Sequence, residues 1–77
     1  MNNKLLKLAL DAHLLNYVEH ETPRHYFIDG HADLETVQEF AELIVQECGR
    51  VMEEKDSYYG EWMKTVINEH FGVNDGD

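Results

Sequence analysis

The sequence predicts an all-α fold: three helices, with a short extended segment between the first and the second, assembled as a homo-oligomer. Apolar residues recur every three or four positions over most of the chain, which is the spacing of one helix face. The one proline and an aspartate–glycine turn signal fall together between residues 23 and 30, where they separate the helices. A chain of 77 residues forms one domain at most. We therefore expect a single domain over residues 1–77, with a frayed tail at residues 73–77.

Two apolar stripes lie side by side on a first helix predicted over residues 3–20. A helix that is apolar over so much of its circumference needs cover on more than one side. In so short a chain, with one cysteine and hence no internal disulfide, the second cover is expected to be another copy of the protein. The alternative is a monomer that wraps its first helix tightly. The residues predicted for self-association are Leu6, Leu10, Leu14 and Val18.

An extended segment is predicted after the first helix. Pro23 should end that helix, because proline disfavours helical geometry in the preceding residue and has no backbone N–H to donate. Tyr26–Ile28 contains the aromatic and β-branched residues that favour a strand, and Asp29 followed by Gly30 signals a turn. A lone strand has unpaired edges. It is therefore expected either to lie over the helices or to pair with its counterpart in a second chain.

The second half of the chain predicts two further helices. Asp33 is a good N-cap for a helix that continues to about Lys55, with an apolar stripe along one side. Ser57 is expected to cap the third helix, and Gly72 falls where a helix C-terminus often needs a left-handed residue. The side chains expected to pack inward from the third helix are Tyr58, Trp62, Met63, Val66, Ile67 and His70 or Phe71.

The composition excludes several classes of partner. The net charge of −10 repels nucleic-acid backbones and anionic membranes, so neither direct nucleic-acid binding nor membrane binding is expected. No apolar run is long enough to span a membrane, and Asp11 and His13 interrupt the N-terminal apolar run, so that it does not read as a signal peptide. Cys48 lies on the apolar stripe of the second helix and is expected to be buried and inert.

No motif in the sequence predicts catalysis, a metal or a cofactor. His20, His25 and His31 lie close in the sequence, but no cysteine or regularly spaced carboxylate joins them, so we expect solvated histidines. Ser57 is the only serine and has the capping role, and no glycine-rich loop is present to hold a phosphate. The chain is therefore expected to be a binding protein, not an enzyme.

An acidic face is the first candidate binding surface. Glu35, Glu39 and Glu42 recur every three or four residues, which places neighbouring carboxylates about 5–6 Å apart on one side of the second helix. Glu53 continues this side. Such a row could imitate the phosphates of a DNA strand and dock a basic protein surface, although a merely solvated face has the same composition.

The tyrosines between the helices are the second candidate surface. Tyr26, Tyr58 and Tyr59 are amphipathic residues of the kind enriched at interaction hot spots. Together with Arg24, they are predicted to contact a protein partner. Alternatively, tyrosines could stack on a nucleobase while Arg24 or Arg50 holds its phosphates.

Three segments resemble a recurrent pattern in small accessory proteins of tailed bacteriophages. They are KLLKLALDA at residues 4–12, FAELIVQEC at residues 40–48 and EHFGV at residues 69–73. No activity is assigned to the pattern, so no functional residue is carried over. The resemblance implies an accessory protein in the cytoplasm of an infected bacterium, where such proteins often inhibit host machinery or antiviral defence. We expect a protein that blocks a host protein with a basic surface by occlusion. The alternatives are an oligomeric sponge for a nucleotide signal and a structural or assembly protein.

Overall fold

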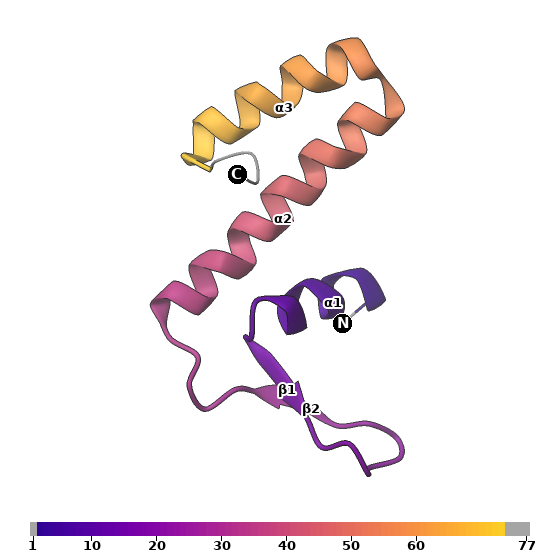
Figure 1. Ribbon diagram of the computed structural model, residues 1–77, viewed down its shortest axis with the longest axis vertical. Coiled ribbons are helices and arrows are strands. Elements are labelled where there is room, and N and C mark those ends of the chain that lie inside the picture. Colours follow the sequence, from indigo (N-terminus) through magenta and orange to yellow (C-terminus); the bar gives the residue numbers. More distant parts are fainter. Residues whose placement is uncertain (1, 74–77) are drawn as a thin grey trace. The chain divides into compact units, whose positions relative to one another are not determined.

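The computed structural model describes residues 2–73, in which three helices and two short strands follow one another (Figure 1). Their order is α1 (Asn3–Asp11), β1 (Leu15–Tyr17), β2 (Tyr26–Ile28), α2 (Leu34–Lys55) and α3 (Ser57–Phe71). The three helices of the predicted fold are confirmed, and an unpredicted β-hairpin lies between α1 and α2. The chain divides into two compact units, one ending at Ala41 and the other beginning at Glu42.

The first helix is much shorter than predicted, because it ends in a Schellman motif at Asp11. The Leu14 N–H donates to the carbonyl of Ala9 at 2.9 Å, and the His13 N–H donates to that of Leu10 at 3.0 Å. His13 is the left-handed residue that this motif requires, with φ of 64°. Glycine usually occupies that position, so a histidine there gives the sequence no visible helix stop.

The residues after α1 form the first strand of an antiparallel hairpin. Leu15 pairs with Ile28 and Tyr17 with Tyr26, so the predicted extended segment finds its partner in its own chain. Pro23 therefore lies in the hairpin connection, after a cis peptide bond, and the prediction that it ends the first helix is wrong. The Asp29 N–H extends the pairing by donating to the Leu14 carbonyl at 2.9 Å.

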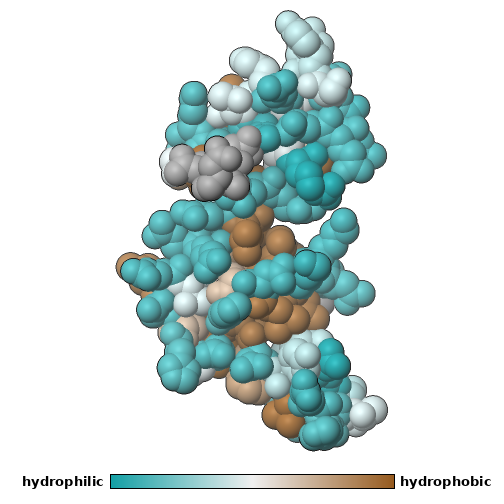
Figure 2. Space-filling model, viewed as in Figure 1, coloured by the Kyte–Doolittle hydropathy of each residue, from teal (hydrophilic) through white to brown (hydrophobic). Residues whose placement is uncertain are grey.

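This shorter helix changes the predicted self-association set. Leu6 and Leu10 are half-buried on α1, whereas Leu14 lies in the connection to β1 and Val18 follows β1 and is exposed. The four residues therefore do not form one helical stripe. The buried centre of this unit is small and consists of Ala9 and Ala12, and Figure 2 shows hydrophobic residues reaching the surface over α1.

The bounds predicted for α2 are confirmed. The Asp33 carboxylate accepts hydrogen bonds from the N–H and the hydroxyl of Thr36, both at 3.0 Å, as an N-cap does. These hydrogen bonds hold the pKa of Asp33 below its usual value, and the one from the Thr36 backbone contributes most. Glu35 in the first turn and Lys55 in the last turn complement the helix dipole.

The structure confirms the prediction for α3 at Gly72. It differs from the prediction at the N-cap of α3 and at Val73. The N-cap is Asp56, whose carboxylate accepts from the N–H groups of Tyr58 and Tyr59, and Ser57 is the first helical residue. Gly72 is left-handed as predicted, with φ of 67°. Val73 is buried and its N–H donates to the Asn68 carbonyl at 2.8 Å, so the predicted fraying is wrong there. The remainder of the predicted tail, residues 74–77, lies outside the described residues.

Over residues 2–73, no helix has the length and apolar character needed to cross a membrane.

His13→Gly is expected to raise the free energy of unfolding by about 0.5–1 kcal/mol, because glycine adopts the left-handed conformation without a Cβ clash. Urea unfolding at pH 7 measures the change. His13→Ala is the matched control, since it removes the imidazole but keeps the strained conformation and should bring no gain. If the alanine variant is stabilised as much as the glycine variant, the backbone explanation fails.

Candidate functional site

The packing of α3 on α2 depends on two glycines. A Cβ at Gly60 would lie 2.1 Å from the carbonyl oxygen of Met52, so a residue with a side chain cannot occupy this position unless the backbone moves. Gly49 is the corresponding position on α2, where a Cβ would lie 2.7 Å from Cγ of Lys64. Both glycines are buried. They determine which side of α3 faces α2.

The side of α3 that faces α2 is polar. Lys64 comes one helical turn after Gly60; its ammonium group forms an ion pair with Glu53, and its side chain is only 18% exposed. Asn68 follows one turn later and is buried, and its amide oxygen accepts no hydrogen bond within the described residues. An unsatisfied buried polar atom costs about 1–3 kcal/mol, so this side is a weak substitute for an apolar core.

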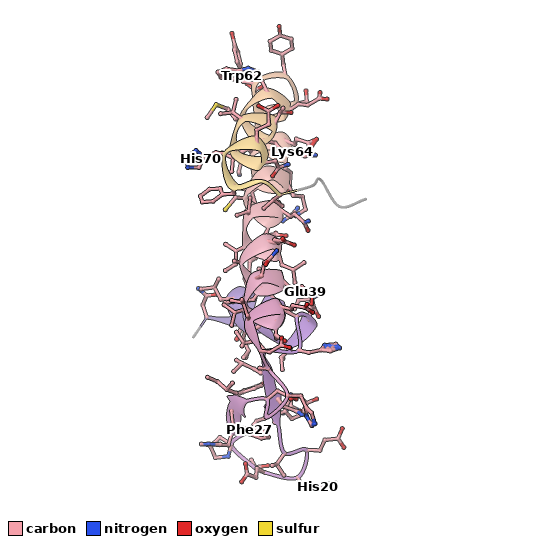
Figure 3. All side chains as sticks on the ribbon, turned by 90° about the vertical axis from the view of Figure 1, so that its left-hand side faces the viewer. His20, Phe27, Glu39, Trp62, Lys64 and His70 are labelled. Atoms are coloured by element: carbon pink, nitrogen blue, oxygen red, sulfur yellow. The ribbon has the colours of Figure 1, made fainter. Side chains whose placement is uncertain are left out.

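The opposite side of α3 is aromatic and exposed. Tyr58, Tyr59 and Trp62 are 79%, 65% and 60% exposed, and Met63 and Val66 are exposed beside them. Figure 3 shows Trp62 and His70 on the side of α3 away from Lys64. The prediction that Tyr58, Trp62, Met63 and Val66 pack inward is therefore wrong, whereas Ile67 of the same predicted set is half-buried. We call Tyr58, Tyr59, Trp62, Met63 and Val66 the aromatic side of α3.

The first turn of α3 holds its aromatic residues in a defined arrangement. The rings of Tyr58 and Tyr59 meet edge to face, with centroids 5.2 Å apart. The Asp56 cap fixes the backbone of both tyrosines through hydrogen bonds of 3.0 Å. A hollow of about 510 Å³ lies over this part of the helix, lined by Tyr58, Tyr59, Glu61, Trp62 and Thr65. Tyrosine and tryptophan in such positions are the residue types that dominate protein–protein hot spots.

The predicted tyrosine surface is divided between the two units. Tyr58 and Tyr59 belong to a helix, not a loop, whereas Arg24 and Tyr26 lie in the hairpin of the first unit. The Arg24 guanidinium stacks on the Tyr17 ring, 4.2 Å from its centroid. A hydrogen bond to the Tyr26 side chain raises the pKa of Arg24. The structure thus joins Arg24 with Tyr26, and Tyr58 with Tyr59.

A second hollow, of about 620 Å³, lies in the first unit. It is lined by Leu10, His13, Leu15, Asn16, Tyr17, Asp29, His31 and Thr36. Its carboxylate, Asp29, accepts hydrogen bonds from the His31 N–H at 2.8 Å and from the Asn16 amide at 3.3 Å. These hydrogen bonds lower the pKa of Asp29, and the one from the His31 backbone contributes most. No group of three histidine, cysteine, aspartate or glutamate residues within 2–73 is placed to hold a metal ion.

The predicted acidic face is reduced in the structure. Glu35 and Glu39 are exposed and Glu42 is half-buried, but Glu53 is engaged by Lys64 of α3. Arg50, the predicted phosphate ligand, binds Glu47 at 3.0 Å through Nε and Glu54 at 2.6 Å through Nη1. Both contacts raise the pKa of Arg50, that with Glu47 more strongly, and they occupy much of its donor edge.

Cys48 departs from its predicted environment. The sequence predicts a buried thiol on an apolar stripe, whereas Cys48 is free and exposed on α2. Val37, Ala41 and Val51 of the same stripe are also exposed. The stripe has the predicted helical spacing but is covered only in part, at Phe40, Ile44 and Met52, which are half-buried.

No protein family, characterised protein or solved structure matches the chain. The segments that carry the phage resemblance have structural roles here. FAELIVQEC at residues 40–48 lies within α2, and EHFGV at residues 69–73 ends α3 through the left-handed Gly72 and the buried Val73. The function is therefore argued from the surfaces that these helices present.

The decisive glycines were the residues that sequence reasoning missed. Gly49 and Gly60 each lie inside a predicted helical segment, where glycine costs about 1 kcal/mol relative to alanine. A glycine retained at such a cost often marks close helix packing. That signal was present and would have identified the side of α3 that faces α2.

Gly60→Ala is expected to lower the free energy of unfolding by about 1–3 kcal/mol, because the added methyl group meets the Met52 carbonyl and its neighbouring backbone. The higher helix propensity of alanine offsets part of this loss. Gly30→Ala is the control, since nothing lies within 4 Å of a Cβ there. Thermal and urea unfolding measure both variants, and equal stability of the two would contradict the close approach at Gly60.

Asp29→Asn is expected to lower stability more at pH 7 than at pH 2.5. The folded pKa of Asp29 is depressed below its usual value of 3.8, so the charged carboxylate contributes stability above that pH. This contribution is lost as the pH falls through the folded pKa. Urea unfolding of the wild type and the variant at the two pH values measures the difference, and a deficit independent of pH would contradict it.

Proposed function

We propose that this chain is a binding protein that docks another protein through the aromatic side of α3 and blocks it by occlusion. The observation that carries this proposal is the exposure of Tyr58, Tyr59 and Trp62 side by side on one helix. Monomeric soluble proteins rarely leave large contiguous apolar patches open, and such patches commonly mark interaction sites. The rigid attachment of α3 at Gly60 supports the same proposal, because a preorganised surface loses little entropy on binding.

The charge of the chain favours a partner with a basic surface. The net charge of −10 attracts a basic protein over long range and speeds the encounter. Glu61 lines the hollow beside Trp62, and Glu35 and Glu39 are exposed on α2, so carboxylates accompany the apolar anchors. Glu53 drops out of the predicted docking set because it pairs with Lys64. In this mechanism the aromatic residues supply the affinity and the carboxylates supply the orientation.

The biological setting follows from the phage resemblance. We propose that the chain acts in the cytoplasm of an infected bacterium on a host factor of defence or of nucleic-acid handling. Proteins that handle nucleic acid have basic surfaces, which fits the charge of this chain. We further propose that the chain acts as a homo-oligomer.

Protein docking is better supported than capture of a nucleotide. The nucleotide alternative relies on Arg24 or Arg50 to hold phosphate groups. Arg50 already binds two carboxylates, and one face of Arg24 is covered by Tyr17. The aromatic side of α3 needs no rearrangement to receive a protein.

Trp62→Ala is expected to reduce the amount of host protein captured from bacterial lysate by roughly tenfold or more, as truncation of a central hot spot does. Tagged wild-type and variant chains are compared by quantitative mass spectrometry. Leu34→Ala is the matched control, because Leu34 is an apolar residue that is 80% exposed in the other unit. The proposal is contradicted if both variants capture the same proteins as the wild type.

The same experiment tests the nature of the partner. Excess duplex DNA should displace a partner whose nucleic-acid-binding surface is the one covered. A captured protein that remains bound in excess DNA would place the contact on a different basic surface.

A further inference from the structure

We infer that the aromatic side of α3 is covered, when no partner is bound, by the aromatic side of a second copy of this chain in a two-fold dimer. The inference rests on the proposed function only in using the same surface. In this inference a second copy covers the aromatic side of α3 until a host protein takes its place.

The chain cannot cover this surface by rotating α3 about its own axis. Rotation would move Gly60 away from Met52 and bring a residue with a side chain into a space that excludes even a Cβ. It would also break the ion pair between Lys64 and Glu53. The exposure of Trp62 is therefore a consequence of how α3 is attached.

The exposed area comes close to the lower limit for a stable specific interface. Aromatic side chains bury roughly 150–250 Å² each, so the exposed fractions of Tyr58, Tyr59 and Trp62 correspond to about 400 Å² per copy. Two facing copies would cover about 800 Å² through these rings alone. Met63 and Val66 add to this area, which then approaches the roughly 1,200 Å² at which stable specific interfaces begin.

The residue order along α3 is self-complementary. Tyr59, Trp62, Val66 and His70 follow one another at intervals of three or four on this side, and Met63 lies beside them, four residues after Tyr59 and three before Val66. Glu69, three residues after Val66, is the one carboxylate that this spacing places on the same side. Two antiparallel α3 helices can be related by a two-fold axis midway between Met63 and Val66. Met63 of each copy then lies opposite Val66 of the other. The same axis sets Tyr59 opposite His70. A two-fold contact requires such a surface, in which one patch meets itself.

Repulsion between the two acidic copies opposes dimer formation. The strength of the dimer is therefore expected to depend on salt concentration. Each copy carries a net charge of −10, Glu61 lies beside Trp62, and Glu69 lies at the C-terminal end of the aromatic side. Repulsion between the copies is screened by salt, whereas the apolar contact is not. The dimer is therefore expected to strengthen from 50 to 500 mM sodium chloride.

The test is the mass in solution by light scattering over a range of concentrations. The wild type is expected at twice the mass of one chain, and Val66→Asp, which places a charge at the centre of the contact, at the mass of one chain. Leu34→Asp is the matched control, because it changes an equally accessible apolar residue in the other unit and should remain dimeric. Far-ultraviolet circular dichroism shows whether both variants keep their helices.

Three results would overturn the two-fold pairing. They are a wild type that stays monomeric at millimolar concentration, a Val66→Asp variant that stays dimeric, and an assembly larger than two. So would a Val66→Asp monomer that has lost its helices if Met63→Glu, with its helices intact, remains dimeric. If the dimer forms as expected but Trp62→Ala captures host proteins as the wild type does, the proposed function fails and the dimer stands. If the wild type is monomeric and Trp62→Ala loses the captured protein, the dimer fails and the proposed function stands.

Discussion

The close approach of α3 to α2 at Gly60 is the constraint on which the second unit depends. It requires the narrow side of α3 to face α2, and that side carries Lys64 and Asn68. The helix therefore contacts its neighbour through an ion pair and a buried amide, and its tyrosines and tryptophan face outward. In most small domains the helix would be turned the other way, because burying one large apolar side chain contributes about 1.5–3 kcal/mol.

In the proposed account, this arrangement would couple folding to association. Among the described residues no large side chain is fully buried, and the buried apolar residues are Ala9, Ala12 and Val73. A folded chain with so little of its own core gains stability from anything that binds the folded form. A second copy and a host protein would both do so through the same aromatic side of α3. Exchange of one for the other would conserve the apolar contact while the carboxylates of the chain select a basic partner.

The helices of the second half could be predicted because their signals are local. Asp33 and Gly72 mark helix ends through their own hydrogen bonds and backbone conformation, and both predictions are confirmed. The end of α1 was missed because His13 occupies a position at which glycine is the usual signal. The hairpin cannot be predicted for the same reason, because residues 15–17 fit the apolar spacing of a helix and Tyr26–Ile28 is then without a partner. The candidate site could be predicted only in part. Tyr58 and Tyr59 were identified from residue type, whereas the outward orientation of Trp62 depends on a contact between Gly60 and Met52 that residue spacing alone does not reveal.

The central claim is that the aromatic side of α3 is covered by another molecule in solution. Trp62 is the only tryptophan of the chain, so its fluorescence reports on this surface without labelling. The measurement is quenching by acrylamide, a neutral quencher, as the purified protein is diluted from millimolar to nanomolar concentration. The account predicts weak quenching in the concentrated protein, which increases on dilution while the helical circular dichroism is still present. Strong quenching that is the same at every concentration would contradict it, because Trp62 would then be open to solvent in a chain that stands alone.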